Sequence, residues 1–194
     1  MKLSSEELRA EALSLLDERR IPHVLGCESE ALRLAERWEA DREAASVAAL
    51  LHDCTKKLSF EEQLKMCSCY GIVLDSGQRE APKLLHALTG AALARERFGV
   101  SEEIEFAIRF HTTGKPEMSL LEKIIYLADY IEPTRAFEGL EALRSLAYED
   151  IDGAMALALE MSLEEIENNG QVPYKDTVEA RNYYRGVICS HRNR

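Results

Sequence analysis

Apolar residues recur every three or four positions along most of the chain, which is the spacing of one face of an α-helix. In the first segment, for example, Leu8, Ala12 and Leu15 form such a stripe, which ends near Arg20. The strict alternation of apolar and polar residues that marks a half-buried strand is nearly absent. The pattern therefore predicts an all-α fold.

Capping residues and glycines indicate where the helices begin and end. Ser4 and Ser59 are each followed, three residues later, by a glutamate, as in a capping box. Gly99, Gly114 and Gly170 lie at breaks in the pattern, where a left-handed residue commonly ends a helix. These signals predict helices over residues 4–20, 23–38, 44–53, 59–70, 82–98, 101–110, 119–131, 140–146, 151–168 and 176–189, with a loop near 71–77. With no internal repeat or linker, residues 1–194 are expected to form a single-domain helical bundle.

The composition is typical of a packed chain without a membrane anchor. Hydrophobic residues make up 46% of the 194 residues, but no segment approaches the roughly 20 apolar residues of a membrane span. The N-terminal segment Met1–Glu7 lacks the basic region and the apolar run of a signal peptide. Five cysteines without a CxxC pair are typical of free thiols in a reducing compartment. We therefore expect a cytoplasmic protein that does not bind membranes.

The net charge of −11 limits the kinds of partner. Binding to a nucleic-acid polymer depends on contacts between cations and phosphates, so the charge argues against such a partner. A small phosphorylated ligand remains compatible with it, because a bound metal ion supplies concentrated positive charge locally.

The most informative chemical feature is the pair His52 and Asp53, which follows the apolar run Ala48–Leu51. An imidazole and a carboxylate are costly to bury unless something binds their lone pairs, and a divalent metal ion does so well. Asp129 is a second acid, near the end of another apolar helix. Of the five histidines, only His191 lies in a polar tail, and the four in predicted helical segments are His23, His52, His86 and His111.

A single histidine of this kind is more often a surface residue or a hydrogen-bonded core residue. Four histidines together with two acids instead favour a catalytic metal site, which needs at least three protein ligands and one open position.

Several stretches of the chain resemble the HD superfamily of metal-dependent phosphohydrolases, and within it the YqeK family of symmetrical dinucleoside-tetraphosphate hydrolases. The stretches run from about residue 23 to residue 184 and are His23–Gly26, Ala48–Lys56, His86–Gly90, His111–Gly114, Glu122–Arg135 and Ala180–Tyr184. An HD pair alone is unspecific, whereas His111–Gly114 followed by Ala128–Pro133 is far more specific. The resemblance implies a helical bundle of the HD-domain type.

The resemblance also implies a ligand set and a reaction. His23, His52, Asp53 and Asp129 match the ligands of a mononuclear HD core, which would bind a divalent transition metal; iron is the metal implied, and the ligand types do not exclude manganese or zinc. His86 and His111 match positions that complete the binding site of a second ion, with Asp53 bridging the two ions. If only one ion binds, the two histidines are instead available to contact phosphate or to protonate the leaving oxygen. The implied reaction is symmetrical hydrolysis of diadenosine tetraphosphate to two ADP, by attack of a metal-bound hydroxide on phosphorus.

Substrate contacts are predicted at both ends of the motif region. Lys56 can neutralise a phosphate, or it is an ordinary solvated charge like its neighbour Lys57. Arg135 follows the Asp129 helix, where its guanidinium suits bidentate phosphate binding. The catalytic residues expected are Asp53, Lys56, His86 and His111. The substrate contacts implied are His23, His86, Thr112, Arg135, Val172, Pro173, Tyr174, Lys175, Asp176 and Thr177, of which Asp176 or Thr177 can also cap the last helix.

Two other functions are compatible with these residues. One is a different HD phosphohydrolase, such as a nucleotidase or a cyclic-nucleotide phosphodiesterase. The other is a non-catalytic nucleotide sensor, which six candidate ligands make less favourable than an enzyme. The pattern indicates neither the base of the nucleotide nor the number of ions, and it leaves a homodimer open.

Overall fold

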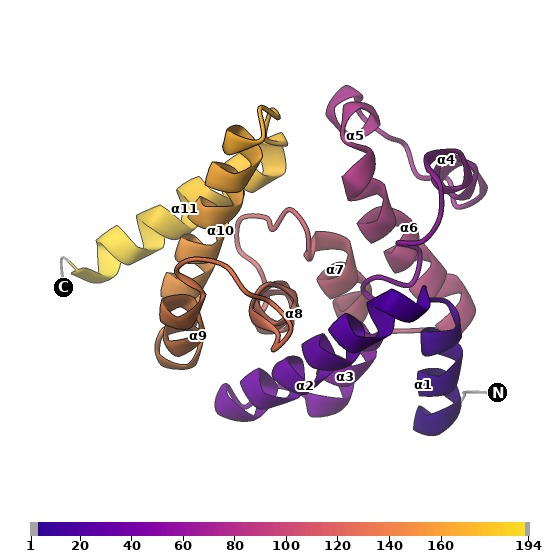
Figure 1. The fold of residues 1–194 in the computed structure, drawn as a ribbon, viewed down its shortest axis with the longest axis horizontal. Coiled ribbons are helices and arrows are strands. Elements are labelled where there is room, and N and C mark those ends of the chain that lie inside the picture. Colours follow the sequence, from indigo (N-terminus) through magenta and orange to yellow (C-terminus); the bar gives the residue numbers. More distant parts are fainter. Residues whose placement is uncertain (1–3, 193–194) are drawn as a thin grey trace.

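Every regular element of the part of the chain that the structure describes is a helix, and the all-α prediction is therefore confirmed (Figure 1). The structure is a computed structural model that describes the backbone of residues 4–192 and the side chains of residues 4–190; Met1–Leu3 and the side chain of His191 lie outside these ranges. The α-helices are α1 (Ser5–Ser14), α2 (Ile21–Arg37), α3 (Arg42–Leu51), α4 (Phe60–Cys69), α5 (Ser76–Glu80), α6 (Leu85–Leu93), α7 (Glu102–Phe110), α8 (Leu120–Ile131), α9 (Leu140–Glu149), α10 (Ile151–Asn168) and α11 (Lys175–Arg192).

The helix ends form as the capping residues predict. Ser4 and Ser59 each accept a hydrogen bond from the backbone N–H three residues later, and the glutamate there reaches back to the backbone of the serine. These reciprocal bonds satisfy two of the N–H groups that a helix start leaves unpaired. Gly99, Gly114 and Gly170 all have positive φ, at 64°, 63° and 68°, and each follows a helix or helical turn.

Two of the predicted boundaries are wrong because of a nearby aspartate. The helix expected over 4–20 ends at Ser14, because Asp17 accepts the N–H of Arg19 and starts a separate 3₁₀ turn at Glu18. The loop expected near 71–77 contains the start of α5, which Asp75 caps. In both places a single aspartate side chain competes successfully with the longer-range pattern.

Helices α2, α3, α7 and α8 form the centre of the molecule. α3 packs against α2, α7 and α8, and α2 also packs against α8. Ala45, Ala48 and Ala49 on α3 are completely buried, which lets the neighbouring helices approach its backbone closely. Figure 1 shows α10 and α11 on one side of this centre and α4, α5 and α6 on the other. The C-terminal end of α3 is thereby placed inside the molecule.

Two sequence predictions about the surroundings of the protein can be compared with these helices. Among the described residues, no helix has both the length and the apolar character that crossing a bilayer requires. All five cysteines are free thiols; Cys27, Cys54 and Cys67 are buried, whereas Cys69 and Cys189 are exposed.

Candidate metal centre

Six side chains that the sequence pattern singled out converge at the centre of the molecule. They are His23 in the first turn of α2, His52 and Asp53 in the turn after α3, His86 in the first turn of α6, His111 directly after α7, and Asp129 in α8. All are buried except Asp129, which is partly exposed. Helices from five different parts of the chain therefore position one cluster.

The turn after α3 aims the HD pair into this cluster. α3 ends at Leu51, and not at Asp53 as predicted, and the N–H of Cys54 donates to the carbonyl of Leu51 in the turn that follows. The hydroxyl of Thr55 then donates to the main-chain oxygen of His86 at 2.9 Å. This hydrogen bond connects the turn to α6, which carries His86.

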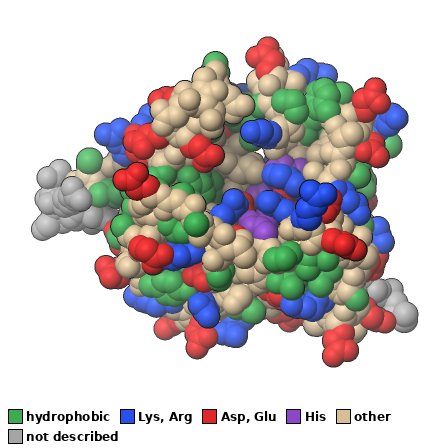
Figure 2. Space-filling view, in the orientation of Figure 1, with side chains coloured by type: hydrophobic (Ala, Val, Ile, Leu, Met, Phe, Trp, Pro, Cys, Tyr) green, Lys and Arg blue, Asp and Glu red, His purple; other side chains and the backbone are tan. Residues whose placement is uncertain are grey.

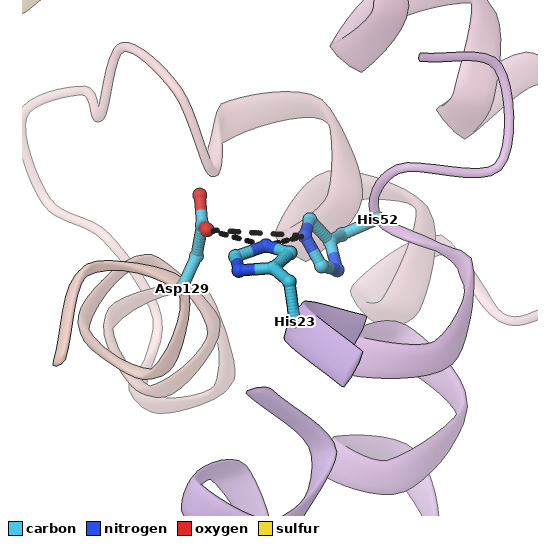
Figure 3. Close-up of side chains that lie close together, drawn as sticks. All are labelled: His23, His52 and Asp129. Carbon is cyan, nitrogen blue, oxygen red and sulfur yellow. Dashed lines mark hydrogen bonds and ion pairs between the residues drawn. The ribbon is translucent and has the colours of Figure 1, made fainter. Parts of the chain in front are cut away.

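Figure 3 shows one half of the cluster, which contains His23, His52 and Asp129. The Nε2 atom of His23 lies 3.4 Å from Nε2 of His52 and 3.0 Å from Oδ1 of Asp129. Oδ1 of Asp129 lies 3.9 Å from Nε2 of His52. Three donor atoms from three elements thus face a common point.

The other half contains His86 and His111, and Asp53 joins the two halves. The Nε2 atoms of His86 and His111 are 3.1 Å apart. Oδ1 of Asp53 lies 3.1 Å from Nε2 of His86 and 3.8 Å from Nε2 of His111. Its other oxygen, Oδ2, lies 3.4 Å from Nε2 of His52. One carboxylate therefore directs one oxygen to each half.

Three of the four histidines are oriented in the same way. In each, ring Nδ1 donates to the main-chain oxygen of the residue three positions earlier. The pairs are His52 with Ala49 at 2.7 Å, His86 with Lys83 at 2.7 Å, and His111 with Ile108 at 2.6 Å. The neutral rings therefore turn unprotonated Nε2 atoms into the cluster, which is the tautomer that metal binding requires.

Burial and neighbouring charges shift the pKa values of the acids and histidines in the cluster. Burial by itself would raise the pKa values of Asp53 and Asp129, but the surrounding histidines hold both well below the usual range. Burial and the charges of His52 and His86 lower the pKa of His111 to about 3. For His52, burial would lower the pKa, but Asp53 and Asp129 raise it. Arg20 and Arg135 supply positive charge beside Asp53 and Asp129 respectively.

The residues present fit a divalent metal. Oδ1 of Asp53 is buried and has no hydrogen-bond partner. The atoms that face it include Nε2 of His86 and Nε2 of His111, and an unprotonated Nε2 cannot donate a hydrogen bond. Such an arrangement is unfavourable unless a cation satisfies the lone pairs. Two overlapping sets, His23–His52–Asp129 and His52–Asp53–His111, have ligand atoms within 4.8 Å of one another. Two atoms bound at roughly 2.0–2.2 Å to one ion lie at most about 4.4 Å apart. The separations of 3.0, 3.4 and 3.9 Å among His23, His52 and Asp129 are within this limit.

Arg20 is a functional candidate that sequence reasoning missed. Its Nε donates to Oδ2 of Asp53 at 2.6 Å, although it is the last residue of the 3₁₀ turn before α2. The sequence places it beside Arg19 at the end of the helix predicted over 4–20, so no local signal distinguishes it. Glu132, whose Oε1 lies 3.0 Å from Nδ1 of His23, was also missed, because this contact joins residues far apart in the sequence.

Lys56 and Arg135, two of the predicted substrate residues, also lie at the cluster. Nζ of Lys56 is 3.1 Å from Nε2 of His86 and 3.9 Å from Oδ1 of Asp53. Nη2 of Arg135 is 2.8 Å from Oδ1 of Asp129. Both side chains are partly exposed, and Figure 2 shows Lys and Arg side chains around a hollow with histidine inside it. The cluster therefore opens to solvent between positive charges, in a protein whose net charge is −11.

Some of the predicted substrate residues surround a small cavity next to α7. Thr112, Tyr174 and Asp176 line it together with Arg109 and Phe110, and its volume is about 40 Å³. The hydroxyl of Thr112 is buried without a hydrogen-bond partner. An unpaired buried hydroxyl beside a cavity is available to a ligand.

The other predicted residues of the 172–177 segment do not line this cavity. Val172 is 91% exposed, and Thr177 is buried in the first turn of α11. The hydroxyl of Tyr174 donates to Asp75 at 2.8 Å, and Lys175 forms an ion pair with the same carboxylate at 3.0 Å. Helix α11 begins at Lys175, so the prediction that Asp176 or Thr177 precedes and caps it is wrong.

A larger groove, of about 720 Å³, lies away from the cluster, between α2 and α9. Arg33, Arg37, Arg144 and Tyr148 line it, and none of the six candidate ligands does. Its arginines already bind glutamates or main-chain oxygens.

The chain is similar to proteins of known family along most of its length. The HD domain family matches residues 20–134. A protein of Halalkalibacterium halodurans named "Bis(5'-nucleosyl)-tetraphosphatase, symmetrical" is 40% identical over 90% of this chain and 95% of its own length. A protein of Bacillus subtilis with the same name is 38% identical over 90% of this chain and 94% of its own length.

A solved structure is also similar. It comes from Clostridium acetobutylicum and is described as a "predicted HD superfamily hydrolase involved in NAD metabolism". Its TM-score is 0.92 at 39% sequence identity, and the match covers 96% of this chain and all of the other. The HD-domain fold that the sequence predicted is therefore confirmed.

Proposed function

This chain belongs to the HD domain family, and from that membership we propose that it is a metal-dependent phosphohydrolase that cleaves diadenosine tetraphosphate symmetrically into two ADP. The observation that carries the proposal is the buried cluster of four histidines and two aspartates with positive charges at its opening. It lies in a chain that resembles symmetrical tetraphosphatases over 90% of its length.

His23, His52, Asp53 and Asp129 are the residues we propose as metal ligands, and His86 and His111 together with Asp53 would hold a second ion. A divalent metal, when bound, supplies Lewis acidity at phosphorus and lowers the pKa of water. Iron is our proposal for its identity, because the resemblance to HD phosphohydrolases implies it; the ligand types suit manganese and zinc equally well. Anaerobic metal analysis of the purified protein tests this choice.

The cations at the opening bind the phosphate chain in this proposal. The substrate is a polyanion, and Arg20, Lys56 and Arg135 offset its charge where it would otherwise meet Asp53 and Asp129. Cleavage consumes one water: the bond from a central phosphorus to the bridging oxygen breaks, and the oxygen of water remains on one of the two ADP products.

We propose that the nucleoside end of the substrate lies over the cavity beside α7, whose volume of about 40 Å³ is too small to enclose a nucleoside. The unpaired hydroxyl of Thr112 and the side chains of Tyr174 and Asp176 support this placement, since they line the same space. Contacts from Val172, Pro173, Lys175 and Thr177 remain predictions. A homodimer and a cytoplasmic location also remain predictions.

Product identity is the experiment that tests the proposed function. Diadenosine tetraphosphate, incubated with the metal-loaded protein, is expected to give ADP only, separated by ion-exchange chromatography. In water labelled with oxygen-18, one of the two ADP molecules from each turnover acquires the label. Formation of AMP and ATP would contradict symmetrical cleavage.

NAD, a nucleoside monophosphate and a cyclic nucleotide belong in the substrate panel, and turnover of one of these alone would indicate a different phosphohydrolase. Metal binding without turnover of any substrate would indicate a sensor.

Lys56 and its neighbour Lys57 form a matched pair for testing the phosphate contact. Lys56 faces His86, whereas Nζ of Lys57 points away and lies 3.5 Å from the main-chain oxygen of Ser14. Lys56→Met is expected to lower kcat/KM about tenfold, the lower end for one charge-assisted hydrogen bond because the side chain is partly exposed. Lys57→Met is the control and should leave kcat/KM unchanged. If the two substitutions lowered kcat/KM equally, the effect of Lys56 would come from its surface charge and not from a specific contact with phosphate.

A further inference from the structure

Glu132 holds the one histidine of the cluster that is oriented differently from the rest. It directly follows α8 and is completely buried, and its Oε1 lies 3.0 Å from Nδ1 of His23. The other oxygen accepts the backbone N–H of Thr134 at 2.6 Å. A carboxylate fixed in this way accepts a hydrogen bond from Nδ1–H of His23. The opposite ring nitrogen, Nε2, then faces the cluster.

His23 differs from the other three histidines because its Nδ1 partner is a side chain. The other rings each donate to a carbonyl on their own segment, so their orientation follows from the local backbone. The orientation of His23 depends on a carboxylate that lies more than a hundred residues away in the sequence.

Gly26 explains how a carboxylate reaches this position. A Cβ atom at Gly26 would lie 2.5 Å from Oε2 of Glu132 and 3.4 Å from Cδ of Pro133. Gly26 lies inside α2 and does not have positive φ, so the backbone does not require glycine there. Glycine in a helix interior costs about 1 kcal/mol relative to alanine. Glycine is needed at position 26 because the side chain of Glu132 occupies the space that a Cβ atom would fill.

We propose that Glu132 is a positioning residue for His23: it fixes the proton on Nδ1 and aims Nε2 at the metal, and Gly26 provides the space for its carboxylate. The proposal rests on the metal site of the proposed function. It predicts that Glu132 and Gly26 act as one unit, although neither contacts the reacting atoms.

Metal affinity and the histidine tautomer are the two measurements that test the proposal. Mn²⁺ is titrated into metal-free protein by equilibrium dialysis, and the tautomer of His23 is read from nitrogen NMR of the metal-free protein, with the signal assigned in a His23→Asn variant. Glu132→Ala is expected to weaken Mn²⁺ binding about 10- to 100-fold. It is also expected to convert the Nδ1–H tautomer of His23 into a mixture. Glu132→Gln retains an oxygen acceptor, so it should keep the tautomer and recover part of the affinity.

Gly26→Ala provides an independent variant, and Gly186→Ala is its matched control. The added Cβ at Gly26 should displace Glu132 and reproduce the loss of affinity seen in Glu132→Ala. In a chain that already carries Glu132→Ala, the same substitution should have little further effect, because the carboxylate is absent. A Cβ at Gly186, in α11, meets nothing within 4 Å, so Gly186→Ala should leave Mn²⁺ affinity unchanged.

Several results would overturn the proposal. An unchanged tautomer and affinity in Glu132→Ala would do so, and so would fully additive effects of Gly26→Ala and Glu132→Ala. Loss of affinity with a retained tautomer would assign Glu132 a purely structural role. Normal Mn²⁺ binding without hydrolysis of any dinucleotide would contradict the proposed function alone and leave the positioning role supported. If the wild-type protein bound no metal, both proposals would fail.

Discussion

Replacing Asp53 with alanine is expected to abolish hydrolysis and to remove most of the bound metal, while the helical content of the protein stays unchanged. Asp53 is the only one of the six side chains whose two oxygens face different halves of the cluster. Losing it removes a ligand from both halves at once. A metal contributes several kcal/mol at phosphorus, so turnover should fall on the order of a thousandfold or more. Helical content should persist because Asp53 lies in the turn after α3 and not within a helix.

Metal content, turnover and circular dichroism, measured on one preparation of Asp53→Ala, decide this prediction. Asp152→Ala is the matched control, because Asp152 pairs with Lys123 at 2.9 Å on α10, away from the cluster. The control should keep both metal and turnover. Full metal loading with normal turnover in Asp53→Ala would show that the cluster is not the active centre.

Replacing His111 with alanine is expected to lower the metal content by about one ion per chain and to lower turnover about 100-fold or more, because a second ion would contribute several kcal/mol at phosphorus. The geometry favours a second ion, because His86, His111 and Oδ1 of Asp53 form their own half of the cluster. Burial and neighbouring charge lower the pKa of His111 to about 3. Its ring is therefore neutral at pH 7, and a neutral imidazole is a metal ligand and not a proton donor.

Metal stoichiometry separates the two roles that the sequence left open for His111. A loss of one ion per chain supports the binuclear site. If the stoichiometry holds while turnover falls, His111 contacts the phosphate chain of the substrate. If neither changes, His111 has no role in the reaction. His86→Ala should give the same result as His111→Ala, since the two rings lie 3.1 Å apart.

The chemistry of the candidate site was largely predictable, because metal ligands are few residue types and stand out on apolar helices. His52 and Asp53 were visible as a pair, and Asp129 as one acid in an apolar run. The residues that assist them were not predictable. Glu132 is a common residue type before a proline, and its importance follows only from contact with a helix distant in sequence.

Helix positions were predictable wherever a capping box or a glycine marked a boundary, as at Ser59 and Gly99. The errors arose where one aspartate redirected the local backbone. Asp17 separates α1 from the 3₁₀ turn that carries Arg20, and Asp75 starts α5. The carboxylate of Asp75 also accepts a hydrogen bond from the hydroxyl of Tyr174, so its role depends on a contact between distant parts of the chain.

The limits of the HD match have an evolutionary consequence. Residues 20–134 contain all six candidate ligands, whereas Tyr174 and Asp176, two of the residues that line the cavity beside α7, lie beyond the match at the start of α11. In the proposed function, the metal and the nucleoside would thus be held in part by different stretches of the gene. Substitutions around Tyr174 and Asp176 are then expected to alter which nucleoside is accepted while the six candidate ligands stay unchanged.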